Sequence, residues 1–419
     1  MKTSPFLFLL AIVFLLSQCR NMPQEPAIQP ALQLSHIQSQ LVEAENQFGF
    51  TLLRELHKNP ENENIVISPL NISMVLSMAL NGAHGETFDA VRSTLGFQNL
   101  FPVEINGGYQ DLYEQLTALD SDVIFSTANS VWFDTTWFNR YNAVESEFLD
   151  VCRTCYHSEI KRTAFGQQGT RDSINAWIAK NTGNVVPEML DEIQRYEVMF
   201  LINTVFLDAP WTKPFDIMTT RRSSFQLADG STVLCYLMHT IDEFSYLNNE
   251  SLQMVDLPYG GGEYSMTLVL PGPDYNLHAL IQEITTERWH TLTGALQPAQ
   301  CTVELPRFRC ASGLNLDSTL CSLGMEIAFD PSRAAFNRIC SQCDTLFYMS
   351  RVLHHTSVVV GEEGTRAAAG TIGGFRYVGV ADFQMTLNRP FLFAIRERST
   401  DTILFLGKIM RPEWPEAAG

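Results

Sequence analysis

The sequence lacks the short motifs that most often mark an enzyme. Its 419 residues contain no H-E-x-x-H zinc motif, no P-loop, no G-x-S-x-G nucleophile turn and no glycine-rich dinucleotide fingerprint. Serine, histidine and aspartate occur, but nothing in their setting marks a nucleophile. The adjacent pair His354 and His355 would point to opposite faces of a strand, so it cannot chelate one metal ion. The sequence therefore predicts a protein that is not an enzyme and that has no metal site or cofactor.

Positive charge is also scarce. The chain carries 28 Lys and Arg against 46 Asp and Glu, a formal net charge of -18, and its basic residues form no cluster. Such a chain is a poor candidate for binding nucleic acid or heparin. Hydrophobic residues make up 45% and charged residues 18%, so a sizeable core is expected. Internal repeats and interior low-complexity blocks are absent, which favours a single folded domain.

The N-terminus carries an apolar run, Pro5–Leu16, behind a short basic lead. This run is too short to span a bilayer as a stable helix and is typical of a secretory signal over residues 1–19. Leu16-Ser17-Gln18-Cys19 resembles a bacterial lipoprotein cleavage box, whose cysteine becomes acylated. Gln18 departs from that pattern, and an ordinary cleavage after Cys19 fits as well.

Export follows from this interpretation. We expect the protein outside the cell or at the cell envelope, with a lipid on Cys19 as its sole membrane attachment. Residues 20–37 are rich in Pro and Gln and are predicted to be a flexible tether. Residues 38–415 are predicted to form the single domain.

Export would also permit disulfide bonds among the remaining cysteines. These are Cys152, Cys155, Cys235, Cys301, Cys310, Cys321, Cys340 and Cys343. Two C-x-x-C pairs among them could supply four thiolates to zinc. The pairs lie far apart in the chain, however, and no histidine spacing supports a zinc site. Disulfides and free thiols both stay open, and the pairing cannot be read from one sequence.

Helical patterns dominate the first half of the chain and strand patterns the second. Residues 38–57 predict an amphipathic helix, and residues 71–80 predict a buried helix that is apolar nearly all round. Continuous or alternating β-type runs follow at Val198–Leu207, Ser265–Leu270, Val303–Phe308, Thr356–Val360, Phe391–Ile395 and Ile403–Lys408. Strands and helices do not alternate regularly, so the predicted class is α+β with large, mostly antiparallel sheets.

Motifs along the chain also match, in order, those of one protein family. They are Asn64–Leu70, Leu80–Thr87, Ala128–Trp132, Ile174–Ile178, Leu201–Phe206, Leu257–Pro271, Leu305–Phe308, Gly361–Ala369, Arg389–Phe393 and Leu406–Lys408. The match extends from residue 38 to residue 412 without a large gap. On these residues the chain resembles the serpins, a family of serine protease inhibitors.

The resemblance implies a serpin fold, with about nine helices, three β-sheets and an exposed reactive-centre loop. In inhibitory serpins a serine protease cuts this loop and is acylated by it, and the cut loop then inserts as a new strand into the main sheet. The implied function is a monomeric suicide-substrate inhibitor that forms a covalent complex with serine proteases. Cysteine proteases are a further class of target.

The loop GEEGTRAAAGTIGG, Gly361–Gly374, decides between inhibitory and non-inhibitory members. The implied hinge consists of Glu362, Glu363, Gly364, Thr365, Arg366, Ala367, Ala368 and Ala369. An inserting strand alternates its faces, so Thr365, Ala367 and Ala369 would point inward, and all three are small. Arg366, where the family usually carries Glu, would point outward. Non-inhibitory serpins often have bulky, charged or proline residues at the inward positions. The loop therefore favours an inhibitor over the alternative, a binding or carrier serpin.

Two further residue sets carry over from the family. The first, the breach, consists of Glu362, Arg307 and Trp211, and Glu362 is expected to pair with Arg307. The second, the shutter, is a hydrogen-bonded cluster under the main sheet and consists of Ser68, Asn71, Asn203 and His354. Asn71 stands where Ser is usual, and its larger amide puts the detailed network in doubt.

The reactive bond is predicted between Val378 and Gly379, found by counting from Gly364 with the spacing customary in the family. A small aliphatic side chain at Val378 favours an elastase-like target. The loop is slightly longer than the commonest spacing, so two neighbouring residues stay open. Tyr377 would direct chymotrypsin-like proteases to the loop, and Arg376 would direct trypsin-like ones.

Overall fold

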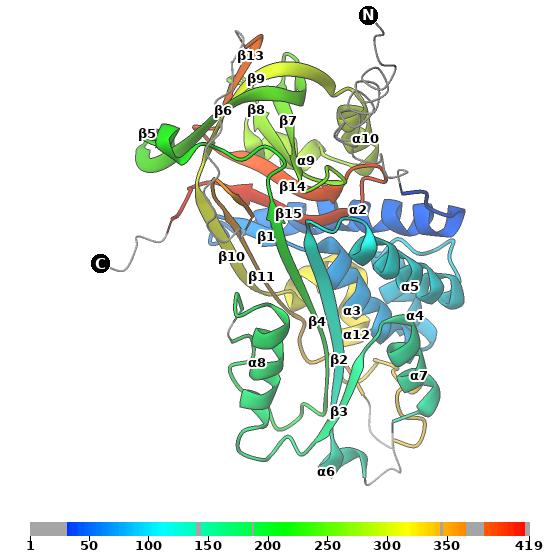
Figure 1. Ribbon diagram of the computed structural model, residues 1–419. Helices are drawn as coiled ribbons and strands as arrows, with labels where there is room; N and C mark the ends of the chain where they lie inside the picture. The colour runs from blue at the N-terminus through cyan, green and yellow to red at the C-terminus, as the bar shows by residue number, and fades with distance from the viewer. Residues whose placement is uncertain (1–31, 140–143, 187, 344–346, 366–380, 415–419) are drawn as a thin grey trace, which may run out of the picture. The chain divides into compact units, whose positions relative to one another are not determined.

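The structure, a computed structural model, describes residues 32–139, 144–186, 188–343, 347–365 and 381–414 (Figure 1). The chain divides into a short N-terminal unit, Met1–Leu32, and a body, Gln33–Gly419, and the account below concerns the body. The predicted signal segment 1–19, Cys19 and most of the predicted tether lie outside the described residues. Along the described part of the chain, no helix combines the length and the apolar character needed to cross a membrane.

The helices begin where the sequence offers caps. Helix α2 starts at His36, two residues earlier than predicted, because Ser35 and Gln38 form a capping box. Helix α3 starts at Pro69 behind the cap Ser68. The helices are α2 (His36–His57), α3 (Pro69–Gly82), α4 (Gly85–Thr94), α5 (Pro102–Ala118), α6 (Thr135–Phe138), α7 (Ser146–Cys155), α8 (Thr170–Asn181), α9 (Leu277–Glu283), α10 (Thr286–Gly294), α11 (Asp317–Leu320) and α12 (Glu326–Phe329), with short turns η1 (Ile217–Thr219) and η2 (Cys321–Met325).

The sheet that matters for function, called here the main sheet, has six strands. In spatial order they are β10 (Phe308–Asn315), β11 (Leu353–Val360), β12 (Gly364–Thr365), β4 (Met199–Pro210), β2 (Ile124–Asp134) and β3 (Glu159–Thr163). The pairs β10–β11, β11–β12, β12–β4 and β4–β2 are antiparallel, and β2–β3 is parallel. Strands β4 and β11 therefore run in the same direction on either side of β12.

The second sheet has nine strands. They are β1 (Ile65–Ile67), β15 (Ile403–Ile409), β14 (Phe391–Glu397), β8 (Tyr264–Pro271), β7 (Leu252–Tyr259), β6 (Thr232–Asn248), β9 (Gln297–Pro306) and β13 (Phe383–Thr386), with β5 (Arg221–Gln226) on β6. Strand β6 pairs through its first residues with β5 and through its last with β7, so it joins two sets of strands. The α+β class is confirmed, while the described strands form two hydrogen-bonded sheets where three were expected.

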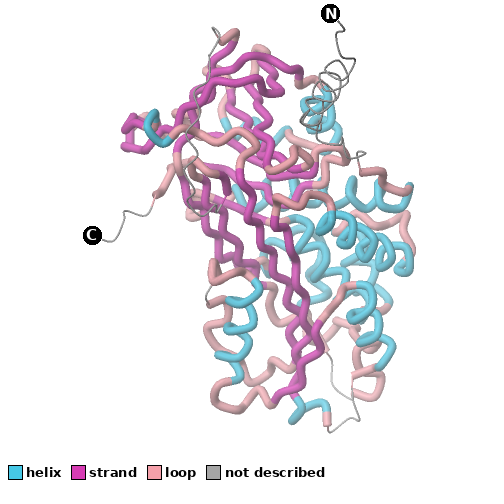
Figure 2. Tube along the Cα trace, in the orientation of Figure 1, coloured by secondary structure: helices cyan, strands magenta, loops and turns pink. Residues whose placement is uncertain are grey.

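The main sheet is covered by helices. Helix α8 packs Ile174, Trp177 and Ile178 against Trp132 of β2 and Ile202 of β4. Helix α3 contacts both β4 and β15, so it lies between the two sheets, which explains its nearly all-round burial. Figure 2 shows α8 beside the long strands, apart from the other helices.

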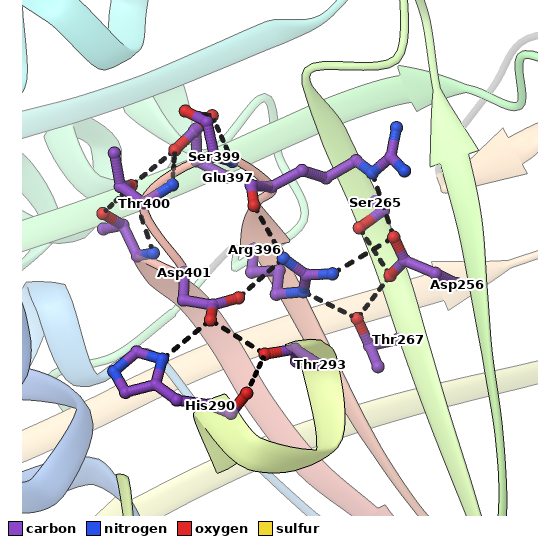
Figure 3. A network of polar contacts seen from close by, with 12 residues as sticks. Asp256, Ser265, Thr267, His290, Thr293, Arg396, Glu397, Ser399, Thr400 and Asp401 are labelled. Atoms are coloured by element: carbon purple, nitrogen blue, oxygen red, sulfur yellow. Dashed lines mark hydrogen bonds and ion pairs between the residues drawn. The ribbon is translucent and has the colours of Figure 1, made fainter. Parts of the chain in front are cut away.

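A buried ion cluster holds the turn between β14 and β15 (Figure 3). The Arg396 guanidinium lies 3.1 Å from Asp256 and 2.7 Å from Asp401, and His290 lies 2.8 Å from Asp401. Burial raises the pKa of Asp256, but Arg396 and the Thr267 hydroxyl outweigh this effect and hold the pKa below its usual value. This cluster stabilises the second sheet.

Candidate functional site

The candidate site begins where the chain turns back at the end of β11. The Gly361 and Gly364 backbones exchange hydrogen bonds of 3.0 and 3.3 Å, which close a tight turn. The next two residues form β12: Thr365 pairs with Val360 on one side and with Ala209 on the other. The first residues of the hinge therefore already lie inside the main sheet, between β11 and β4.

Gly364 is required at this position by close approach. A Cβ there would stand 2.2 Å from the Ala209 carbonyl oxygen and 2.7 Å from the Pro210 Cα, and the residue has φ +151. No side chain fits against backbone at such distances. Only glycine therefore lets the hinge enter the sheet here.

The breach residues lie together at the base of the loop. Arg307 donates from Nε to both carboxylate oxygens of Glu362, at 2.7 and 2.9 Å, and the Thr220 hydroxyl donates to the same carboxylate at 2.6 Å. The Arg307 guanidinium also lies over the rings of Tyr236 and Trp414. The Glu362 side chain is 9% exposed, so the pair is largely desolvated.

Trp211 forms a wall of the same site. Its ring stacks on Tyr259 with centroids 4.3 Å apart, and its Nε1 donates to the Gly361 carbonyl at 2.9 Å. Its backbone N–H donates to the Glu363 carbonyl at 2.9 Å. Tyr259 shares a short hydrogen bond with the Thr365 hydroxyl, and burial raises the pKa of this phenol well above its usual value. The hydroxyls of Thr365 and Tyr259 thus satisfy each other.

The shutter residues divide into two groups in the structure. His354 Nε2 accepts a hydrogen bond from the Ser68 backbone N–H at 3.1 Å, and Ser68 Oγ accepts from the Asn71 N–H at 3.4 Å. Burial lowers the pKa of His354 to about 3, with a further contribution from His355. His354 is therefore neutral, with its proton on Nδ1.

Asn203 belongs to the second group. Its side-chain amide donates to Asn129 Oδ1 at 2.6 Å, and Asn129 in turn donates to the Tyr156 carbonyl at 2.7 Å. Among the described residues, the side chain of Asn203 makes no hydrogen bond to His354 or Ser68. Sequence reasoning placed the four residues in one cluster and missed Asn129. The signal was present in the A-N-S-V-W motif, but the partner depends on the register of β2 and β4.

Several buried polar atoms around the centre of the main sheet have no hydrogen-bond partner among the residues that the structure describes. They are Asn71 Oδ1, Thr127 Oγ1, Asn203 Oδ1, Thr356 Oγ1 and Ser357 Oγ. An unpartnered buried polar group costs about 1–3 kcal/mol. In addition, β4 and β11 pair with each other nowhere in the described residues and are joined only through β12. The hydrogen-bonding capacity of the main sheet is therefore not fully used in this state.

Other predicted site residues lie outside the described part of the chain. They are Arg366, Ala367, Ala368, Ala369, Arg376, Tyr377, Val378 and Gly379. Cys340 and Cys343 form a disulfide, whereas Cys152 and Cys155 are free. Within the described ranges no group of three or more His, Cys, Asp or Glu side chains could hold a metal ion.

Comparison with known proteins identifies a family for this chain. The family model described as "Serpin (serine protease inhibitor)" matches residues 43–412. Human Serpin B11 is 29% identical over 391 residues, covering 87% of this chain and 98% of the relative. The bovine leukocyte elastase inhibitor is 29% identical, covering 89% of this chain and 100% of the relative.

Solved structures give the same result. The thermophilic serpin tengpin in the native state superposes with a TM-score of 0.81 at 26% identity, covering 91% of this chain and 96% of tengpin. Human thyroxine-binding globulin complexed with thyroxine superposes with a TM-score of 0.80 at 25% identity, covering 90% of this chain and 99% of the other. The predicted serpin fold is confirmed, and the chain belongs to the serpin family.

Proposed function

We propose that this chain is an inhibitory serpin, which traps serine proteases of the elastase type as a suicide substrate. The observation that carries the proposal is the position of the hinge. Gly364 and Thr365 already pair between β11 and β4, in the place where a cut loop would insert. The chain is thus an inhibitor that a protease cleaves once, and it is not a catalyst itself.

The register of β12 supports insertion of the rest of the hinge. Thr365 faces Ala209 and both are buried, so a strand continued antiparallel to β4 would set Ala367 opposite Leu207, on the same inner face. A methyl group there needs no large cavity and leaves no buried charge unpaired. The same register sets Arg366 opposite Asp208 on the outer face. The Asp208 carboxylate would then balance the positive charge of Arg366, which stands where the family usually carries Glu.

The proposed chemistry is an ordinary acyl transfer that stops at the acyl-enzyme ester. The protease serine oxygen bonds to the Val378 carbonyl carbon, and the amine of Gly379 leaves after taking up a proton from the protease. The ester then holds the protease to the cut loop. An inserted strand would pair with both β4 and β11, and backbone hydrogen bonds contribute about 1 kcal/mol each. This gain drives insertion before water completes the hydrolysis.

The named relatives support two different functions within the family. Several are leukocyte elastase inhibitors, which agrees with a small aliphatic residue at Val378. Thyroxine-binding globulin, by its name and its complex, binds thyroxine, and this favours the alternative of a binding or carrier serpin. The small inward residues of the hinge are the reason for preferring the inhibitor.

A protease panel tests the proposal. The full chain is incubated with elastase, chymotrypsin and trypsin, and the products are separated on denaturing gels. We expect a covalent complex with elastase and a released peptide whose mass spectrum starts at Gly379. A release at Arg376 or Tyr377 would reassign the reactive bond, and complete absence of a denaturant-stable complex would refute the inhibitor.

A hinge variant provides the matched control. Thr365→Arg would bury a charge beside Tyr259 and should prevent insertion, so elastase should cut the loop without being trapped. Trapping by this variant at the wild-type rate would show that insertion between β11 and β4 is not the mechanism.

We also propose export with a lipid on Cys19, on the basis of the apolar run and the cleavage-box resemblance at the N-terminus. Metabolic labelling with a fatty acid tests it in a bacterial host that processes lipoproteins. An unlabelled mature protein that begins at Arg20 would refute the lipid and leave export standing.

A further inference from the structure

A cavity lies at the end of the main sheet that is farthest from β12. Its volume is about 360 Å³, within the range of roughly 300–1,000 Å³ seen for small-molecule sites. It opens between the first residues of β4 and of β11, with α8 and α3 contributing further walls. Most of the lining is apolar and includes Ile174, Ile178, Leu190, Phe200, Ile339 and Leu353. Water gains little there, so an apolar ligand segment would be favoured.

The polar groups inside the wall are already engaged with each other. The buried Glu197 accepts a hydrogen bond from Arg351 Nη2 at 2.9 Å and one from the Gln194 backbone N–H at 2.7 Å, and the ion pair brings Arg351 Nε within 2.6 Å of Glu197 Oε1. The Ser350 hydroxyl adds a third hydrogen bond to this carboxylate at 3.2 Å. Arg351 also lies over the Phe200 ring, 5.9 Å from its centroid. This pair closes part of the wall and leaves no unbalanced charge toward the cavity.

Arg195 differs from these groups. It contributes to the lining and is exposed, beside the exposed ring of Tyr196. Unlike Arg351, it makes no hydrogen bond or ion pair with any residue that the structure describes. The exposed acid nearby, Glu192, accepts a hydrogen bond from Gln194 instead. Arg195 thus places a cation at the rim above an apolar chamber.

We propose that this cavity binds an amphipathic carboxylate, with its apolar tail inside and its carboxylate on Arg195. The two observations are independent: the lining selects a hydrocarbon tail, and the guanidinium selects a planar anion. A fatty acid of medium chain length has this chemistry. The breach and the hinge play no part in the site, since they lie at the opposite end of β4.

The test uses the intact, uncut chain and does not depend on any protease. Fluorescence of cis-parinaric acid, a fluorescent fatty acid, reports entry into an apolar site, and dodecanoate and dodecanol then compete with it. We expect dodecanoate to displace the probe and dodecanol, which has the same tail without the charge, to be about tenfold weaker. No probe uptake by the wild-type chain would overturn the proposal.

Two variants and one control test which residues contact the carboxylate and which contact the hydrocarbon tail. Arg195→Gln should weaken dodecanoate about tenfold and leave dodecanol unchanged. Arg222→Gln, at an exposed arginine of β5, is the matched control and should bind like wild type. Ala79→Leu adds carbon atoms to the lining from α3 and should reduce uptake of both competitors. Wild-type affinity for dodecanoate in Arg195→Gln or in Ala79→Leu would show that the acid binds elsewhere.

A consequence follows that rests on the proposed function. A loop strand inserting between β4 and β11 would end near this cavity, so a bound acid should slow completion of insertion. Dodecanoate should then raise the share of chains that elastase cuts without being trapped, and Arg195→Gln should remove this effect. A protein that binds the acid but traps elastase equally well with it would contradict the consequence and leave the binding site standing.

Discussion

At the scale of single residues, the ion pair of Glu362 and Arg307 ties the base of the loop to the strand beside it. The carboxylate accepts three hydrogen bonds and is largely shielded from water, so Glu362→Gln would leave the Arg307 charge without its partner. We expect a loss of about 2 kcal/mol in the free energy of unfolding, measured by chemical denaturation. The exposed pair of Asp150 and Arg153 is the control, and Asp150→Asn should cost less than about 0.5 kcal/mol. Equal losses in the two variants would contradict this account of Glu362.

Gly364 permits a second prediction at the same scale. Gly364→Ala would place a methyl group on the backbone of Ala209, so the hinge must leave the sheet. Protease trapping should slow, and more inhibitor should be consumed for each protease trapped. Gly107→Ala, in open space within α5, is the control and should behave as wild type or be slightly more stable. If Gly364→Ala traps elastase as efficiently as wild type, entry of the hinge at this point is not needed.

The same residues show what a sequence can predict about this site. Resemblance to a family identified Glu362 and Arg307, because each stands within a motif that can be recognised by itself, and Trp211, which follows the Leu201–Phe206 motif. Asn129 was not predicted, because its contact with Asn203 arises only when β2 and β4 pair with these two residues directly opposite each other. That register is set by packing of the whole sheet and cannot be read from either strand alone.

At the scale of elements, β11 depends on a histidine that must stay neutral. The pKa of His354 falls from about 6.5 unfolded to about 3 folded, so its stabilising effect is complete above about pH 6.5 and is lost as the pH falls toward 3. Between pH 7 and pH 5 the folded chain should lose about 2 kcal/mol through this group. Protonation would set an N–H of His354 against the Ser68 N–H and loosen β11 from α3.

Chemical denaturation at pH 7 and at pH 5, in wild type and in His354→Gln, measures how much stability is lost through His354. The variant should lose about 2 kcal/mol less than wild type on acidification, because it has no imidazole to protonate. His36→Gln, at an exposed histidine, should keep the wild-type pH dependence. The same pH dependence in His354→Gln as in wild type would mean that other groups cause the acid sensitivity.

Elements with a strong local signal were predictable, and those that depend on neighbours were not. The runs at residues 198–207, 265–270 and 403–408 each became a strand, β4, β8 and β15, because they are apolar and bounded by turn residues. The long strand β6 was missed: its exposed and buried residues alternate irregularly, since β5, β9 and β7 cover it in turn. Joining the two strand sets through β6 is therefore a property of the assembled sheet.

At the scale of the whole molecule, the chain holds a sheet that is not yet complete. In the part of the chain that the structure describes, strands β4 and β11 are joined only through the two residues of β12, and buried polar atoms near them lack partners. Under the proposed function, cleavage of the loop would let it supply the missing strand. The proposal therefore implies that the folded, uncut chain is kinetically stable and that the chain with an inserted loop is more stable.

Cutting the loop in the intact chain tests this directly and separates an inhibitor from a carrier. If about ten residues insert and each gains about 1 kcal/mol, the melting temperature should rise on the order of 10 °C or more. Differential scanning calorimetry before and after limited cleavage by elastase measures the shift, and the Thr365→Arg variant, cut at the same bond, should show none. A wild-type chain whose melting temperature is unchanged by cleavage would keep its loop outside the sheet, as a carrier serpin does, and the small side chains of the hinge would then need another explanation.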